Sequence, residues 1–202
     1  MKTQLLIITA LESELKRDAL PQGVEIVYCG VGKLNAAITT INAINQFVPK
    51  RLLNFGTVGK VNPKLKGLLE IDKVIQRDMI AEPLVPRGQT PFCSHPHEYF
   101  SESFPDSFSQ SAFEEVRHVC GTGDSFVNAS DPWLLDQGID VVDMELFAIA
   151  RVAHQKNIPW QSFKYITDDA NEDSGKDWQE RVNHGQELFL KTLKEIFSKC
   201  CE

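Results

Sequence analysis

The sequence predicts an α/β fold in which a central mixed, largely parallel β-sheet is flanked by helices. Two observations lead to this prediction. Short apolar runs of strand length alternate with segments whose apolar residues recur at helical spacing, and several of the runs end in glycine-rich or acidic segments. The chain of 202 residues suits one hydrophobic core, and no linker, repeat or low-complexity tract divides it. We therefore expect residues 1–202 to form a single domain.

The first part of the chain is expected to contain three strands and one long helix. Residues 4–10 are a continuous apolar run, which is typical of a strand that is buried on both faces. A short helix or loop at 12–18 and a second strand at 24–29 follow. Residues 33–47 carry apolar side chains every three or four positions, which predicts a helix, and residues 51–55 form the third expected strand.

The second part is expected to alternate strands and helices around a long irregular segment. Segment 83–111 is rich in Pro, Ser and Phe and has no clear period, so we expect a long loop that acts as a lid or an interface. Gly185 interrupts the last helix and weakens the prediction there. The expected elements are extended segments at 71–76 and 78–82, strands at 115–120, 139–143 and 160–166, and helices at 131–136, 144–155 and 177–199.

Charge and composition argue against several classes of function. The formal net charge is −7 and no basic stripe offsets it, so we expect no binding to DNA or RNA. No apolar run approaches the ~20 residues of a membrane-spanning helix, and the apolar start is too short for a signal peptide. The five cysteines are odd in number and form no CxxC pair, which favours reduced thiols and a cytoplasmic location.

Four short motifs lie where predicted strands end, and each has both a functional and a structural interpretation. Gly30–Gly32 and Gly56–Gly59 let backbone N–H groups approach a ligand, but glycines also form tight turns. Asp143–Glu145 and Thr167–Asp169 supply carboxylates, but acidic residues also stabilise helix N-termini. Because ligands of such sheets bind beyond the carboxyl ends of the strands, the convergence of these motifs indicates a binding site.

No cofactor or metal ion is expected. The glycines at 30–32 lack the third glycine of a dinucleotide fingerprint, and no P-loop is present. His95 and His97 lie two residues apart in the irregular segment, but no third metal ligand accompanies them.

Six motifs spread nearly from end to end carry a family resemblance. They are ALESE at 10–14, CGVGKLNAA at 29–37, NFGTVG at 54–59, TGDSFV at 122–127, VDME at 142–145 and ITDDA at 166–170. In this order they resemble the nucleoside phosphorylase/nucleosidase superfamily, and most closely the 5′-methylthioadenosine/S-adenosylhomocysteine nucleosidases. The resemblance implies a phosphorylase/hydrolase-like fold, a homodimer, and hydrolysis of the N-glycosidic bond of a purine nucleoside with release of adenine.

The resemblance assigns catalytic roles to three acidic residues. Glu14 matches the carboxylate that activates the attacking water, Glu145 the carboxylate that holds the ribose hydroxyls, and Asp168 the acid that protonates or hydrogen-bonds purine N7. Elementary chemistry explains why acids are needed. The purine leaves more easily when N7 is protonated, and carboxylates stabilise the sugar as it becomes cationic.

The resemblance also implies a set of substrate-binding residues. Phe126 matches an aromatic ring that stacks on the base, with the Phe126–Val127 backbone reading the base edge. Met144 lies beside the sugar, and Thr57 meets the water or the sugar. The whole expected binding set is Val31, Thr57, Val58, Gly59, Phe126, Val127, Met144 and Lys164.

Three departures from the family pattern leave the 5′ substituent open. Lys164 stands where the nucleosidases usually have Arg, and Lys loses the forked geometry of a guanidinium. Lys60 replaces a glycine, and the stretch between Glu14 and the second strand is shorter than usual, so that a hairpin is missing.

Three alternative functions remain open at this point. Phosphorylases of the superfamily hold phosphate with arginines, one just before the third strand's glycine motif, but Asn54–Phe55 occupies that place, which favours water over phosphate. The alternatives are a futalosine-hydrolase-like or other purine nucleosidase, a purine nucleoside phosphorylase, and a nucleoside-binding protein without catalysis. The retention of all three acidic residues argues against the last.

Overall fold

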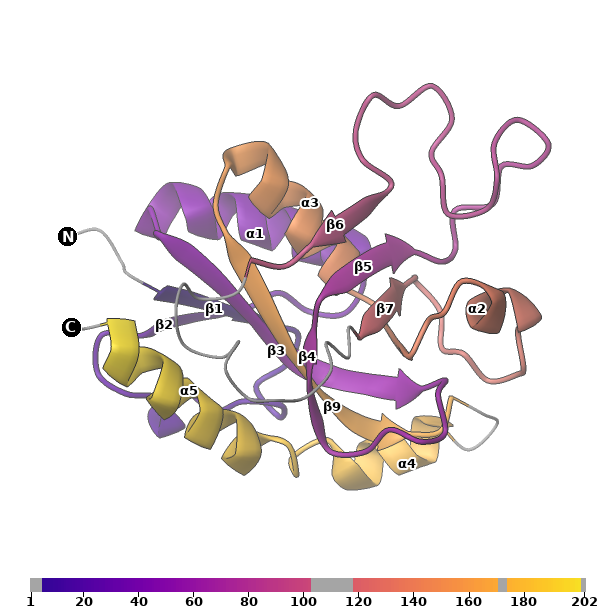
Figure 1. Cartoon of the computed structure of the whole chain (residues 1–202). Coiled ribbons are helices and arrows are strands. Elements are labelled where there is room, and N and C mark those ends of the chain that lie inside the picture. The colour runs from indigo at the N-terminus through magenta and orange to yellow at the C-terminus, as the bar shows by residue number, and fades with distance from the viewer. Residues whose placement is uncertain (1–4, 103–117, 171–173, 201–202) are drawn as a thin grey trace.

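The computed structural model describes residues 5–102, 118–170 and 174–200, and it confirms the predicted α/β fold class (Figure 1). The strands within these residues are β1 (Leu5–Thr9), β2 (Glu25–Tyr28), β3 (Arg51–Lys60), β4 (Leu68–Ile71), β5 (Lys73–Gln76), β6 (Glu98–Phe100), β7 (Val119–Thr122), β8 (Val141–Asp143) and β9 (Trp160–Asp168). The helices are the 3-10 helix η1 (Arg17–Ala19), α1 (Lys33–Phe47), α2 (Pro132–Asp136), α3 (Leu146–Lys156), α4 (Ser174–Arg181) and α5 (Gln186–Cys200).

The described strands form one mixed sheet that is largely parallel in its central part. Its order is β2-β1-β3-β8-β7-β5-β6, and β9 pairs with both β3 and β4. The pairs β1–β2, β1–β3, β3–β9, β5–β7 and β7–β8 are parallel. The pairs β3–β8, β4–β9 and β5–β6 are antiparallel. Because the β3–β8 pair is antiparallel, β5, β7 and β8 run opposite to β1, β3 and β9. The end of β8 therefore lies beside the last residues of β3, where Val142 is opposite Gly59.

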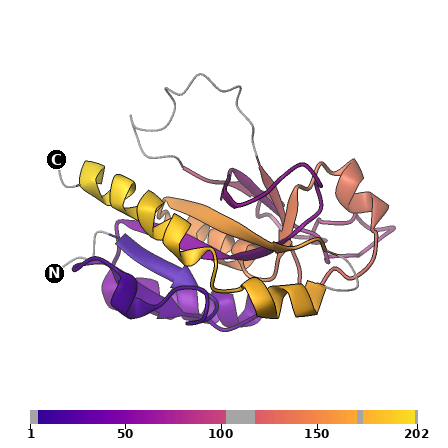
Figure 2. The ribbon, with the colours of Figure 1, turned by 90° about the horizontal axis from the view of Figure 1, so that it is seen from below.

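Alternate side chains of the central strands supply two hydrophobic clusters. Leu6 and Ile8 of β1 pack with buried residues of α1 and α3, whereas Leu5 and Ile7 pack with buried residues of α5. Figure 2 shows α1 and α5 on opposite faces of the sheet. Because β1 is buried on both faces, its sequence is continuously apolar, as expected for a central parallel strand. No helix in the described part of the chain is long and apolar enough to span a membrane.

Strand β3 corrects the prediction that the third strand ends in a turn at Gly56. The strand continues to Lys60 because it pairs with β9 along its length, from Leu52 opposite Trp160 to Gly59 opposite Asp168. Gly56 and Gly59 of this strand allow side chains of other residues to approach its backbone closely. A Cβ atom on Gly59 would lie 2.7 Å from Asp168 Oδ1.

Other boundaries differ in ways that depend on pairing. Segment 78–82 forms no strand, and the expected loop at 83–111 contains the short strand β6, which is held by β5. Residues 103–111 of that loop, and 115–117 of the strand expected at 115–120, lie outside the described residues.

The single helix expected at 177–199 is two helices, and Gly185 lies where they separate. Gly185 is buried, and a Cβ atom there would lie 2.5 Å from Cβ and 2.6 Å from Cγ of Tyr165 on β9. The chain thus passes against the sheet at Gly185 before α5 begins. From there Phe189 stacks on Phe55 of β3 with ring centroids 4.3 Å apart.

We predict that Gly185→Ala destabilises the protein by about 1–3 kcal/mol, since the added methyl group overlaps Tyr165 and forces α4 and α5 away from β9. Denaturant unfolding of both proteins measures the difference. Asn183→Ala, at an exposed position in the same turn, is the matched control. Equal unfolding free energies for the two variants would contradict the role given to Gly185.

Candidate active site

A cavity of about 230 Å³ lies beyond the carboxyl ends of the central strands. The structure brings ten of the eleven sequence-predicted site residues to its lining. These are Glu14, Val31, Thr57, Val58, Gly59, Phe126, Val127, Met144, Glu145 and Asp168. Residues from distant parts of the chain thus meet at one place, as the convergence of strand-end motifs predicted.

Glu14 is buried, and four donors surround its carboxylate. Oε1 accepts from the backbone N–H of Thr57 at 2.9 Å and from its hydroxyl at 2.8 Å. Oε2 accepts from the hydroxyl of Thr9 at 3.2 Å and from the N–H of Leu11 at 3.1 Å. A backbone turn from Leu11 O to Glu14 N fixes the loop after β1. Both carboxylate oxygens are therefore held in place by the ends of β1 and β3.

The Thr57 hydroxyl also contacts a residue that the sequence motifs did not single out. The indole N–H of Trp178 on α4 donates to Thr57 Oγ1 at 2.8 Å, and Trp178 lines the cavity. Trp178 belongs to none of the strand-end motifs, so no sequence pattern identifies it.

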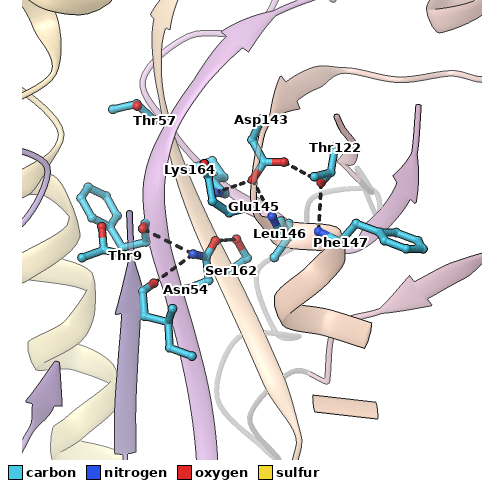
Figure 3. Close-up of polar contacts among 12 residues, drawn as sticks. Thr9, Asn54, Thr57, Thr122, Asp143, Glu145, Leu146, Phe147, Ser162 and Lys164 are labelled. Carbon is cyan, nitrogen blue, oxygen red and sulfur yellow. Dashed lines mark hydrogen bonds and ion pairs between the residues drawn. The ribbon is translucent and has the colours of Figure 1, made fainter. Parts of the chain in front are cut away.

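Lys164, which was expected to contact substrate, does not line the cavity. Its side chain is 1% exposed, and its ammonium lies 2.8 Å from Asp143 Oδ2 in a fully buried ion pair (Figure 3). The pairing of β9 with β3 places Lys164 opposite Gly56. A Cβ atom on Gly56 would lie 3.2 Å from the Lys164 ammonium. Lys164 therefore pairs with the buried Asp143, whereas the family resemblance implied a contact between Lys164 and the substrate.

Asp143 gathers contacts from three further groups. Its Oδ1 accepts from the Thr122 hydroxyl at 2.6 Å, and its Oδ2 accepts from the backbone N–H of Leu146 at 2.9 Å. The Thr122 oxygen in turn accepts from the N–H of Phe147 at 3.0 Å. The nearby ammonium of Lys164 helps to lower the pKa of Asp143 against the opposing effect of burial. Asp143 therefore stays ionised and ties the ends of β7 and β8 to the first turn of α3.

Glu145 lies at the start of α3, where its Oε1 accepts from the backbone N–H of Gly32 at 2.9 Å. Burial, together with the negative charge of Asp143, raises the pKa of Glu145 to about 7, while Lys164 and the Gly32 N–H oppose the shift. Gly32 has a φ of 96°, a conformation that favours glycine. The glycine motif and the acidic motif are thus two halves of one contact.

Asp168 lies at the end of β9, just after an irregularity in the pairing with β3. Val58 pairs with Ile166 but Gly59 pairs with Asp168, so Thr167 is an extra residue. Such bulges commonly redirect a side chain beside an active site. The carboxylate accepts from the N–H of Ala170 and from the Thr167 hydroxyl, both at 3.0 Å.

Arg77 is a second lining residue that the sequence did not reveal. It is buried, and its guanidinium donates to the carbonyl oxygens of Gly123 and Ser125 and to the Ser125 hydroxyl. These contacts fix the backbone that leads to Phe126, whose side chain is 53% exposed at the cavity. An arginine after a short apolar strand has no motif that would distinguish it from a surface residue.

Within the described residues, no group of three or more His, Cys, Asp or Glu side chains is placed to hold a metal ion. His95 is exposed in its loop. Asp169, which follows Asp168, forms an ion pair with Lys60 at 2.6 Å.

The fold and the site define a class of protein in which buried carboxylates surround a small-molecule cavity at strand ends. A family model described as the phosphorylase superfamily matches residues 22–200. The chain therefore belongs to the phosphorylase superfamily, as the motif resemblance predicted.

Individual relatives lie within the nucleosidases of this family. The chain is 27% identical over 188 residues to a 5′-methylthioadenosine/S-adenosylhomocysteine nucleosidase of Marinomonas sp., covering 86% of this chain and 80% of the relative. It is 29% identical to the enzyme of that name from Geobacillus kaustophilus, covering 88% and 83%.

Solved structures show the same fold. A Helicobacter pylori nucleosidase variant with 5′-methylthioadenosine in its active site matches with a TM-score of 0.82 and 21% identity, covering 98% of this chain and 100% of the other. A futalosine hydrolase mutant of Helicobacter pylori matches with a TM-score of 0.82 and 18% identity, covering 98% and 99%.

We predict that Glu145→Gln stabilises the ligand-free protein at about pH 8 by on the order of 1–3 kcal/mol. The raised pKa of Glu145 means that its contribution to stability is present below about pH 4.5 and is lost as the pH rises through about 7. Glutamine keeps an acceptor for the Gly32 N–H without the buried charge. Denaturant unfolding at about pH 5 and about pH 8 measures the difference, which should shrink toward the lower pH. A variant that is no more stable than wild type at either pH would contradict the buried charge.

Proposed function

We propose that this protein hydrolyses the N-glycosidic bond of purine nucleosides of the 5′-methylthioadenosine/S-adenosylhomocysteine type and releases adenine. One observation carries the proposal: Glu14, Glu145 and Asp168 reach a single cavity from the ends of different strands, each with its carboxylate oriented by hydrogen bonds. The names of the relatives support the same reaction.

The arrangement provides a distinct chemical task for each carboxylate. Glu14 takes a proton from water, whose oxygen lone pair attacks C1′ of the ribose. Glu145 accepts hydrogen bonds from the ribose hydroxyls and stabilises positive charge on the sugar. The electrons of the breaking C1′–N9 bond pass to the purine, and Asp168 supplies the proton or hydrogen bond at N7. Negative side chains thus lie where positive charge develops.

Protein groups already engage the cations in and near the site, which favours water over phosphate as the nucleophile. Among the described residues that line the cavity, Arg77 is the one cation, and backbone carbonyls already hold its guanidinium. Lys164 is engaged by Asp143, and Lys33 lies 2.5 Å from Asp78. Asn54, at the position where an arginine is expected in phosphorylases of the superfamily, is buried and donates a hydrogen bond to Ile8 O.

Futalosine-type nucleosides are the second candidate substrates. The structural match to a futalosine hydrolase has the same TM-score as the match to the nucleosidase, so the fold does not separate the two substrate classes. Lys164 stands where the nucleosidases usually have an arginine, and its ammonium is paired with Asp143. This difference leaves the 5′ substituent of the nucleoside open. The substrate panel below therefore includes both classes.

We predict that the protein releases base from 5′-methylthioadenosine or S-adenosylhomocysteine without phosphate. The panel also contains adenosine, inosine and futalosine, each assayed with and without phosphate by chromatography of the free base. Release that requires phosphate would overturn the hydrolase proposal, and purine binding without any release would favour the non-catalytic alternative.

Asp168→Asn should lower kcat by about 10²–10⁴-fold, because the variant loses the acid that assists purine departure. Asp169→Asn is the matched control, since Asp169 is paired with Lys60 and does not line the cavity. An Asp168→Asn variant as active as the control would remove Asp168 from the catalytic set.

We also propose that the protein is a cytoplasmic homodimer. Helix α1 supports the dimer, because Leu34, Ile38 and Ile41 form an apolar stripe at helical spacing and are 72%, 51% and 37% exposed. The free thiols of Cys29, Cys93 and Cys120 support the location. Light scattering should give twice the chain mass, and Leu34→Glu with Ile38→Glu should halve it. A monomeric mass for the wild-type chain would refute the dimer.

A further inference from the structure

The four hydrogen bonds to Glu14 raise the question of where a water molecule meets this base. A carboxylate has about four lone-pair positions, and four donors already occupy them here. A water that gives its proton to Glu14 must therefore take the place of one donor.

The Thr57 hydroxyl is the donor that water can replace. Two of the four donors are backbone N–H groups, which the turn after β1 and the strand β3 hold in place. The third is the Thr9 hydroxyl, whose residue is 0% exposed. Thr57 alone among the hydroxyl donors lines the cavity. Water from the cavity thus enters between Thr57 Oγ1 and Glu14 Oε1.

Trp178 determines how the Thr57 hydroxyl is oriented. An indole N–H only donates, so the bond from Trp178 Nε1 to Thr57 Oγ1 uses a lone pair of the hydroxyl oxygen. The single hydroxyl proton must then point elsewhere, and Glu14 Oε1 is its acceptor at 2.8 Å. When water enters, the anchored hydroxyl donates to the water oxygen, and the water donates to Glu14.

We propose that Trp178 is a positioning residue that acts through Thr57 to hold the attacking water against Glu14. The proposal rests on the proposed hydrolase function and deepens it. In the reaction, the water O–H bond breaks as its proton moves to Glu14 Oε1, and the oxygen lone pair forms the bond to C1′ while the C1′–N9 bond breaks. Trp178 touches none of the reacting atoms in this scheme.

The test uses Trp178→Phe, which keeps the aromatic wall and removes the N–H donor. One hydrogen bond contributes about 0.5–1.5 kcal/mol, so kcat should fall roughly 2- to 13-fold while KM stays within about twofold of wild type. In a Thr57→Val background, the same substitution should cause no further loss, because the hydroxyl that it orients is absent. Thr57→Ser, which keeps the hydroxyl, should retain the dependence on Trp178.

An independent measurement does not need activity. The indole N–H resonance of Trp178, assigned by its loss in Trp178→Phe, should move upfield and exchange faster with solvent in Thr57→Val. A wild-type kcat in Trp178→Phe, a loss confined to KM, additive losses with Thr57→Val, or an unmoved indole resonance would each overturn the positioning role. Failure of the hydrolase proposal is distinguishable, since the wild-type protein would then release no base from any nucleoside in the absence of phosphate.

Discussion

The buried ion pair between Asp143 and Lys164 is the contact on which the rest of the site depends. It joins the end of β8 to β9, and it crosses β3 at Gly56, where no side chain intervenes. The same carboxylate accepts from Thr122 of β7 and from the first turn of α3. Such a pair is weak evidence for stability, because desolvation offsets much of its attraction, but loss of one partner leaves an uncompensated buried charge. Its effect is therefore to fix the strand ends relative to one another.

The charge pattern of the site follows from this pair. Burial and the charge of Asp143 raise the pKa of Glu145 to about 7, and Lys164, which is paired with Asp143, only partly offsets this shift. In the proposed reaction, the same buried charge that costs stability stabilises the sugar as it becomes cationic. An ionised Glu145 thus lowers the stability of the fold but favours the proposed reaction. The contacts of Asp143 keep Glu145 in place in spite of this cost.

The sequence predicted elements with regular apolar spacing and residues in short motifs. It did not predict features that depend on packing between elements distant in the chain. Helix α1 has the predicted bounds of 33–47 because its apolar spacing is a local property. The motif residues line the cavity because strand ends meet there. The break at Gly185 and the continuation of β3 through Gly56–Gly59 depend on packing against β9, which single-strand patterns do not contain. Arg77 and Trp178 lie outside every motif and reach the site only through the fold.

The glycines of β3 are needed for packing against β9, although they belong to a motif at the candidate site. Added side chains at Gly56 and Gly59 would meet the ammonium of Lys164 and the carboxylate of Asp168, respectively. The glycine motif therefore leaves space for side chains of β9, and Thr57 is its one polar side chain at the cavity. The carboxylates are fixed by this shared sheet geometry, whereas Trp178 comes from α4 at its margin. A substitution at such a marginal position therefore changes how the proposed water is held and leaves the sheet unchanged.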